Sequence, residues 1–174
     1  MSALNSNHPP NIFRLLDRVV TLATPSVTPS TTEGYHRCDR IIYDELQPRK
    51  FGVVALQELC WTGQKVLKSG HRAATFYQSC GTTNELGTDF VVLGKMRQRV
   101  IGWLPTNARI SRLRIKGRFF NYSIINVHCP HEGRPDDEKE SFYAQLEQVY
   151  DSCPQRDVKI VIGDVNAQVG RENF

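Results

Sequence analysis

The stretch of sequence that decides the fold is Val158-Lys159-Ile160-Val161-Ile162-Gly163-Asp164-Val165-Asn166. Its first five residues are rich in valine and isoleucine, and such a short apolar run is typical of a strand buried in a sheet. The run ends at a carboxylate and an amide, which a buried strand does not need for its own packing. Two other strand-like runs end in the same manner, at Gln57-Glu58 and at Asn126-Val127-His128. Ligand sites gather at strand ends, so we expect these polar groups to lie together.

The other predicted elements indicate a mixed α and β fold in which sheet dominates. Lys116-Gly117-Arg118 is predicted to be a hairpin turn. A helix is predicted between Pro135 and Pro154, because acidic residues follow the first proline and an apolar stripe faces one side. That stripe consists of Phe142, Leu146, Val149 and Cys153. Strands are predicted within residues 53–56, 90–93, 99–104, 109–115, 119–127 and 158–162, and a short helix within residues 41–46.

The composition is that of one globular domain of ordinary size. The chain has 174 residues, 40% of them hydrophobic, and its 22 Lys+Arg against 18 Asp+Glu give a net charge of +4. This length is sufficient to bury a hydrophobic core. No apolar run approaches the roughly 20 residues that span a bilayer, which excludes an integral membrane protein. The N-terminus has neither the basic start nor the apolar stretch of a secretory signal.

The cysteines indicate reduced thiols and therefore an intracellular protein. They are odd in number, widely spread and never arranged as a close pair, so neither a disulfide framework nor a thiolate zinc site is predicted. They are Cys38, Cys60, Cys80, Cys129 and Cys153.

Residues 1–50 are predicted to form an atypical N-terminal segment. The pattern of apolar residues at positions 11–20 is compatible with either a short amphipathic helix or a strand. Proline and hydroxyl residues at positions 24–32 predict an exposed linker. The succession of strands and helices starts at Phe51, so the main domain is predicted to cover residues 51–174.

The polar strand ends are suited to a divalent metal ion. Together they offer two carboxylates, an imidazole and amides, and the carboxylate and amide oxygens are the hard ligands that Mg²⁺ or Mn²⁺ prefers. Magnesium sites of this kind usually retain several waters and are completed by the phosphates of a substrate.

Four motifs in this order resemble the endonuclease/exonuclease/phosphatase superfamily, in particular the apurinic-endonuclease-like domain of non-LTR retrotransposons and the craniofacial development protein 2-like sequences. The motifs are Val54-Ala55-Leu56-Gln57-Glu58, Leu86-Gly87-Thr88-Asp89-Phe90-Val91-Val92, Ile125-Asn126-Val127-His128-Cys129-Pro130 and Ile162-Gly163-Asp164-Val165-Asn166-Ala167. The resemblance covers residues 51–174 and implies a two-sheet sandwich flanked by helices, a four-layer αββα architecture. It also implies cleavage of phosphodiester bonds with the aid of Mg²⁺ or Mn²⁺.

The resemblance assigns a role to five residues. Glu58 corresponds to the metal-binding glutamate, and Asp164 to the residue that orients or activates the attacking water. Asn166 corresponds to a residue that holds a phosphate oxygen, and His128 stands beside the scissile phosphate. Arg109 is the member of the basic series Arg109, Arg112, Arg114, Lys116 and Arg118 that best matches the family, as a contact to nucleic acid.

The resemblance also predicts what is absent and what the chain contacts. The family's first strand carries an asparagine motif that residues 13–22 lack, and a Ser-Asp-His strand of the family lies beyond Phe174. We therefore expect a domain that is incomplete at its C-terminus, with DNA nicking impaired by the truncation.

DNA is the expected partner, and a small phosphoester substrate is less favoured. A nuclear location is expected by analogy only. Incomplete sheets would leave exposed edges and predict self-association.

Simpler interpretations stay open for each residue at this point. Glu58 could form a surface salt bridge, and Asp164 with Asn166 could make a turn bonded to its own backbone. His128 could be a packed histidine, and the basic series could be the solvated face of a hairpin. At the level of the whole chain, the alternative to a nuclease is a catalytically inactive remnant that binds nucleic acid or another partner.

Overall fold

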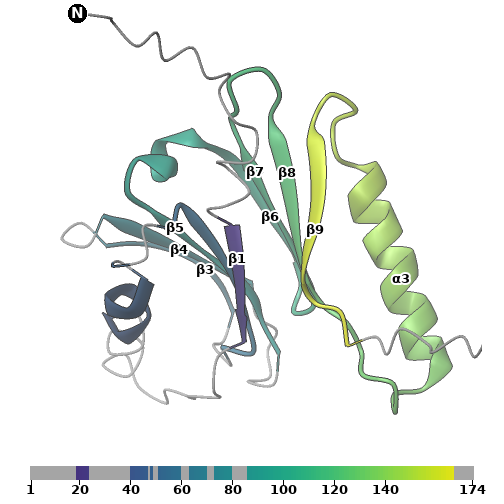
Figure 1. Cartoon of the computed structure of the whole chain (residues 1–174). Helices are drawn as coiled ribbons and strands as arrows, with labels where there is room; N and C mark the ends of the chain where they lie inside the picture. Colours follow the sequence, from purple (N-terminus) through teal and green to yellow (C-terminus); the bar gives the residue numbers. More distant parts are fainter. Residues whose placement is uncertain are drawn as a thin grey trace, which may run out of the picture.

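The computed structural model describes residues 19–23, 40–46, 48, 51–59, 63–69, 73–79 and 86–166. Within these residues two β-sheets pack against each other, and a helix lies on the outer side of each sheet (Figure 1). The layers are helix, five-stranded sheet, four-stranded sheet and helix, which confirms the predicted αββα sandwich. None of the helices in this part of the chain has the length and apolar character needed to cross a membrane.

The first sheet is built from the N-terminal half of the described chain. Its strands are β1 (Val19–Ala23), β2 (Val53–Gln57), β3 (Gln64–Ser69), β4 (Ala74–Ser79) and β5 (Thr88–Leu93). They are arranged in the order β1-β2-β5-β4-β3, with β1 and β2 parallel and the other neighbours antiparallel. Strands β3 and β4 were not predicted. Strand β3 is an exposed edge strand that lacks the apolar run of a buried one, and β4, although mostly buried, has polar residues among its apolar ones.

The second sheet contains four strands in sequence order. They are β6 (Val100–Asn107), β7 (Ile110–Ile115), β8 (Tyr122–His128) and β9 (Val158–Asp164). A 3₁₀ helix, η2 (Gly94–Arg99), connects the two sheets, and helix α3 (Asp136–Asp151) connects β8 to β9. Strand β9 is parallel to β8, so α3 is a crossover helix lying on the outer side of this sheet (Figure 1).

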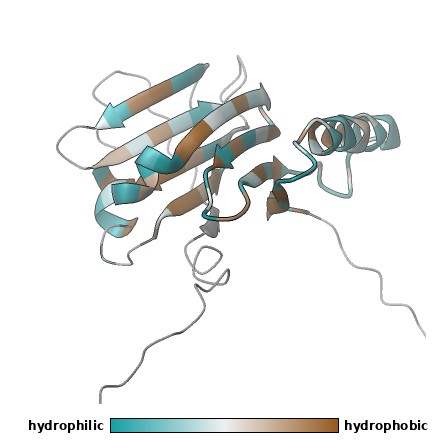
Figure 2. Cartoon of the chain, turned by 90° about the horizontal axis from the view of Figure 1, so that it is seen from above, coloured by the Kyte–Doolittle hydropathy of each residue, from teal (hydrophilic) through white to brown (hydrophobic). Residues whose placement is uncertain are grey.

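Three hydrophobic clusters separate the four layers. The cluster between the sheets includes Phe90 from the first sheet and Ile124 from the second. A second cluster lies outside the first sheet, where Leu46 of the helix at residues 40–46 packs on β2 and β5. The third joins Ile125 of β8 to Phe142 of α3, which confirms the predicted apolar stripe. Figure 2 shows that the strands hold most of the hydrophobic residues, whereas α3 is largely hydrophilic.

Two described parts of the N-terminal segment, residues 19–23 and 40–46, belong to the first sheet or pack on it. Strand β1 pairs with β2, so Val19 and Val20 lie in a strand and not in a helix. The predicted helix at residues 41–46 is present and packs on the sheet. The predicted linker at residues 24–32 lies outside the described residues, and the domain boundary at residue 50 stays a prediction.

Two predictions about strands were wrong in detail. Strand β8 begins at Tyr122, three residues later than predicted, and Phe119 and Phe120 before it are exposed. Strand β9 is not buried, because Val158 and Val161 are 39% and 44% exposed. The reason is that β9 pairs with β8 on one side, while no strand among the described residues pairs with its other side. Self-association through such an edge stays a prediction.

The basic series along β7 connects the second sheet to the α3 layer. Arg109 forms an ion pair of 3.0 Å with Glu138, and Arg112 donates a 3.0 Å hydrogen bond to the Ser152 hydroxyl. Arg114 holds the buried carboxylate of Asp157 through bonds of 2.6 and 3.0 Å, which keep the pKa of that carboxyl below its ordinary value. The interpretation of these three arginines as a solvated hairpin face is therefore wrong.

Candidate functional site

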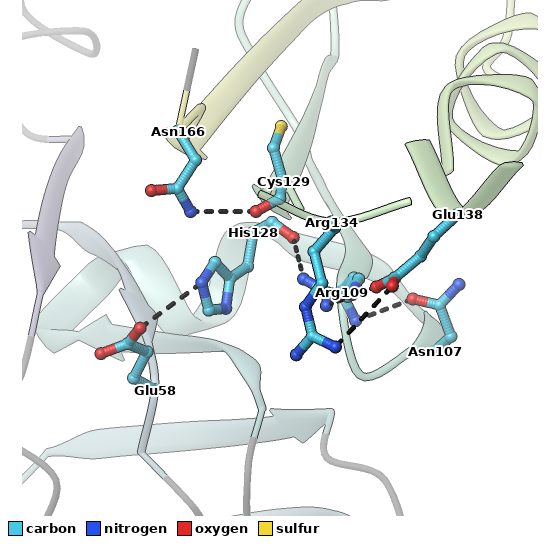
Figure 3. Close-up of polar contacts among 8 residues, drawn as sticks. All are labelled: Glu58, Asn107, Arg109, His128, Cys129, Arg134, Glu138 and Asn166. Carbon is cyan, nitrogen blue, oxygen red and sulfur yellow. Dashed lines mark hydrogen bonds and ion pairs between the residues drawn. The ribbon is translucent and has the colours of Figure 1, made fainter. Parts of the chain in front are cut away.

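Four of the predicted residues lie at the carboxyl ends of β2, β8 and β9, and Figure 3 shows three of them, Glu58, His128 and Asn166. Glu58 directly follows β2, and its Oε1 atom is 3.4 Å from Nε2 of His128 at the end of β8. In the parallel pair β8–β9, His128 is the Cα partner of Asp164. Asn166 follows two residues later. The structure therefore places Glu58, His128, Asp164 and Asn166 at one end of the sandwich.

Unusual backbone geometry sets the positions of these side chains. Glu58 has φ +61° and Asn166 has φ +43°, both in the left-handed region that residues other than glycine seldom adopt. Regular alternation would place Glu58 on the outer face of the first sheet, opposite to Gln57, and the positive φ interrupts that alternation at the strand end. Strained residues of this kind are concentrated at functional sites.

Gly163 allows β9 to approach β8 closely at the site. A Cβ atom at this position, which has φ +135°, would lie 1.9 Å from the carbonyl oxygen of Val127. Only glycine fits so close an approach, which brings Asp164 beside His128. The simpler interpretation of Asp164 and Asn166 as a turn is also correct in its geometry, because Oδ1 of Asp164 accepts a 3.0 Å bond from the Asn166 amide. This turn presents the Asn166 side chain, whose Nδ2 donates 2.9 Å to the carbonyl of Cys129 (Figure 3).

His128 is buried, whereas its acidic neighbour is accessible. The side chain of His128 is 7% exposed and that of Glu58 is 47% exposed. Burial lowers the pKa of His128 below its ordinary value of 6.5, with Arg109 lowering it further and the carboxylates of Glu58 and Asp164 opposing the shift. The imidazole is therefore neutral at pH 7, and one of its nitrogens carries a proton that can be donated in a hydrogen bond.

The titration of His128 gives a prediction that requires no activity. We expect a midpoint below 6.5 in an NMR titration of its ring protons, and a still lower midpoint in Glu58→Gln, because the carboxylate stabilises the imidazolium. Because the folded state binds this proton less readily, the free energy of unfolding should decrease as pH falls from about 6.5 toward the folded pKa, by at most about 1.4 kcal/mol per pH unit. A midpoint that rises in Glu58→Gln would contradict the assigned contact.

Arg109 is part of the site's framework. Its Nη2 is paired with Glu138, its Nη1 donates 3.3 Å to the carbonyl of His128, and its backbone amide donates 2.8 Å to Asn107. Arg134 lies 3.8 Å from the second oxygen of Glu138. These contacts hold the end of β8 against the start of α3 (Figure 3). The predicted contact of Arg109 with nucleic acid stays a prediction.

Sequence reasoning did not identify Asn107, Arg134 or Glu138 as parts of this framework. The acidic residues after Pro135 are explained by the helix dipole, and nothing in the local sequence signals that Glu138 meets Arg109. The surplus of positive charge along β7 was the one available signal, because partly buried guanidinium groups need acidic or carbonyl partners.

Gln57 and Asn126 lie deeper than the sequence suggested. Nε2 of Gln57 donates 2.6 Å to Oδ1 of Asn126, and Nδ2 of Asn126 donates to the carbonyls of Leu56 and Asp89 at 3.1 and 2.9 Å. Both amides are fully buried between the sheets. The polar strand ends therefore form two groups. Gln57 and Asn126 form a hydrogen-bonded pair between the sheets, the buried tie, whereas Glu58, His128, Asp164 and Asn166 form the accessible site.

Cys129 does not belong to the site's reactive groups. It lies in the hydrophobic cluster below α3, whereas Asn126, two residues before His128, points between the sheets. Burial raises the pKa of the Cys129 thiol to about 11, with Asp164 adding to the shift, so the thiol is protonated at neutral pH.

The donor set fits a sparsely liganded Mg²⁺ ion better than a metal held by protein groups alone. Among the described residues no group of three or more His, Cys, Asp or Glu side chains could hold a metal. Glu58 and Asp164 nevertheless offer hard carboxylate oxygens at the same end of the sandwich, and Mg²⁺ commonly binds one or two carboxylates, several waters and a substrate phosphate.

The chain resembles known proteins in sequence. No family model matches it. Craniofacial development protein 2 of Bos taurus is 28% identical over 136 residues, which cover 77% of this chain and 22% of that protein. The protein of the same name from Tragulus javanicus is also 28% identical over 136 residues, covering 77% of this chain and 23% of that protein. The chain thus spans less than a quarter of the length of these relatives.

Solved structures establish the fold. Humanized D. rerio TDP2 superposes with a TM-score of 0.58 at 14% identity, covering 87% of this chain and 62% of that one. The catalytic domain of Xenopus laevis APE2 gives 0.56 at 17% identity, with 75% and 55% covered. The endonuclease domain of TRAS1, a telomere-specific non-LTR retrotransposon, gives 0.55 at 19% identity, with 86% and 59% covered.

The fold is that of the endonuclease/exonuclease/phosphatase superfamily, as the sequence motifs predicted. In sequence, the chain resembles craniofacial development protein 2.

Proposed function

We propose that the chain is a nuclease-like domain that hydrolyses phosphodiester bonds in DNA with the aid of Mg²⁺ or Mn²⁺. The observation that carries the proposal is the meeting of Glu58, His128, Asp164 and Asn166 at the ends of three separate strands. Such a convergence of carboxylates, an imidazole and an amide is suited to hydrolysis of a charged ester. The fold alone does not choose a reaction, so the residues must carry the argument.

Solved structures with the same fold support DNA as the substrate. D. rerio TDP2 has been crystallised with a single-stranded DNA product, and it superposes with a TM-score of 0.53 at 15% identity. The 3′ phosphatase NExo from Neisseria is bound to a product DNA hairpin, with a TM-score of 0.54 at 18% identity. The likeness to the TRAS1 endonuclease domain favours nicking of one DNA strand, as in a non-LTR retrotransposon.

Each residue has a distinct role in the proposed reaction. Glu58, half exposed beside the site, would hold the metal ion together with waters and substrate phosphate. The metal, when bound, would neutralise the charge that develops on the phosphate and the leaving group. Asp164 would orient the attacking water and accept its proton. The neutral imidazole of His128 and the second N–H of the Asn166 amide would donate to non-bridging phosphate oxygens.

Nicking of supercoiled plasmid by the full chain tests this proposal. We expect relaxed circles with Mg²⁺ or Mn²⁺ and none with excess EDTA. Glu58→Gln should lower the rate by about 10²-fold or more, because the amide removes the charge that binds the metal. Glu140→Gln, an exposed change on α3, is the matched control and should leave the rate unchanged. Absence of nicking in the unmodified chain, or equal rates for Glu58→Gln and Glu140→Gln, would contradict the proposal.

A further inference from the structure

Positive charge is concentrated in the middle of the chain. Between Phe90 and His131 there is no Asp or Glu, and this segment holds eight Lys and Arg residues, twice the net charge of the whole chain. The eight residues are Lys95, Arg97, Arg99, Arg109, Arg112, Arg114, Lys116 and Arg118. The rest of the chain is therefore acidic on balance, so the molecule is strongly polarised along its sequence.

Five of these eight cations lie on two segments that are joined by a backbone hydrogen bond. Arg109, Arg112 and Arg114 contact the α3 layer, as described above. The other five form no ion pair among the described residues, and they lie on η2 and on the β7–β8 connection. The backbone amide of Lys116 donates a 2.7 Å bond to the carbonyl of Arg99, which joins these two segments. They form a basic tip consisting of Lys95, Arg97, Arg99, Lys116 and Arg118.

Two exposed aromatic rings lie next to these cations. Phe119 is 70% exposed and Phe120 is 57% exposed. The guanidinium of Arg118 lies 5.3 Å from the centroid of the Phe119 ring. In this position neither phenylalanine packs in the hydrophobic core, and both expose apolar rings within a cationic surface.

The connection that carries the two rings is held in place. A Cβ atom at Gly117 would lie 1.8 Å from the carbonyl oxygen of Phe120, so the turn closes tightly on itself. The carbonyl of Asn121 accepts a 2.8 Å bond from Val158 at the start of β9, and the bond from Lys116 to Arg99 fixes the other side. The rings are therefore presented by an ordered turn, which lowers the entropy cost of binding.

We propose that this basic tip and its two phenylalanines bind single-stranded nucleic acid. Bases would stack on Phe119 and Phe120, while the lysine and arginine side chains would contact the phosphates, the combination that sequence-tolerant single-strand binders use. The choice of nucleic acid as occupant rests on the proposed function, and the positive charge and the flat exposed rings fit that choice.

The tip is distinct from the candidate catalytic site. His128 lies at the carboxyl end of β8, whereas the tip precedes the first residue of the same strand, so the strand separates them by about 20 Å. Figure 1 shows the β7–β8 connection at the upper end of the second sheet, opposite to the end at which β8 leads into the loop before α3. A nucleic acid strand bound at the tip would therefore stay on the protein without occupying the candidate catalytic site.

Fluorescence anisotropy with a labelled oligothymidylate tests the inference. Measurements on the full chain in EDTA keep catalysis out of the result. We expect Phe119→Ala/Phe120→Ala to weaken binding by about 10-fold or more, the loss typical of removing base stacking. Lys116→Gln/Arg118→Gln should reduce the slope of log K against log [salt] by about 1.4, since each phosphate contact contributes about 0.7 for single strands.

Control measurements show whether the oligonucleotide binds at the tip or at the candidate catalytic site, and whether the tip binds another partner instead. Tyr143→Ala removes a ring on α3 that is 51% exposed, and it should leave affinity unchanged. The inference would be overturned if Phe119→Ala/Phe120→Ala left oligonucleotide affinity unchanged. It would also be overturned if the tip variants altered only co-sedimentation with liposomes or self-association of the chain. Plasmid nicking that fails while oligonucleotide binding persists would contradict the proposed reaction alone.

Discussion

Replacing Asp164 with asparagine is expected to lower the rate of plasmid nicking by about 10²–10⁴-fold. Asparagine has nearly the same shape, and its side-chain oxygen can still accept the bond that the Asn166 amide now donates to Oδ1 of Asp164. The substitution therefore removes the negative charge and the ability to accept a proton while the turn is kept. A loss of rate on this scale would assign Asp164 to the chemical step.

Two measurements show whether that loss comes from chemistry or from folding. Urea unfolding of Asp164→Asn should agree with the unmodified chain to within about 0.5 kcal/mol, as expected for a substitution that keeps the local bonds. Asp151→Asn, at the exposed C-terminal end of α3, should change neither the rate nor the stability. Full activity in Asp164→Asn would remove Asp164 from the mechanism and leave the site without a base.

The strands that pack in the interior were predictable because each contains an uninterrupted apolar run. Val53–Gln57 and Thr88–Leu93 are buried on both faces, and the short apolar run within each was sufficient to locate it. The helix after Pro135 was predictable for a different reason, because its single apolar stripe and its acidic first turn agree. Strand β3 was not, because its side chains face solvent and only pairing with β4 defines it.

The site was predictable in its membership and less so in its geometry. The polar ends of the runs at Glu58, His128 and Asp164 stood out because buried strands have no local reason to end in charge. Sequence could not show that Glu58 turns toward His128, because regular alternation would place Glu58 on the outer face and only its positive φ interrupts that alternation.

The free energy of unfolding is expected to fall by about 3–5 kcal/mol in Asn126→Leu, because several buried polar groups lose a partner and each costs about 1–3 kcal/mol. The amide of Gln57 would lose its acceptor, and the carbonyls of Leu56 and Asp89 would lose a donor. A folded domain is stable by only about 5–15 kcal/mol, so this loss is a large fraction of the total. Urea unfolding monitored by circular dichroism measures the change.

Two further variants make the origin of the loss explicit. Asn121→Leu changes the same residue type at the partly exposed tip, where the side chain forms no hydrogen bond among the described residues, and should alter stability by less than about 0.5 kcal/mol. The double variant Gln57→Leu/Asn126→Leu should be less destabilised than the sum of its single variants, because replacing both partners leaves fewer unpaired groups. Additive effects would show that the two amides do not act together.

The buried tie also bears on catalysis, because Asn126 connects the strand that leads to His128 with the strand that leads to Glu58. If the tie sets the 3.4 Å approach of these two side chains, Asn126→Leu should reduce plasmid nicking at temperatures where the variant is still folded. The NMR midpoint of His128 should then become insensitive to Glu58→Gln. A variant that is less stable but retains both the full rate and the Glu58-dependent midpoint would confine Asn126 to stability.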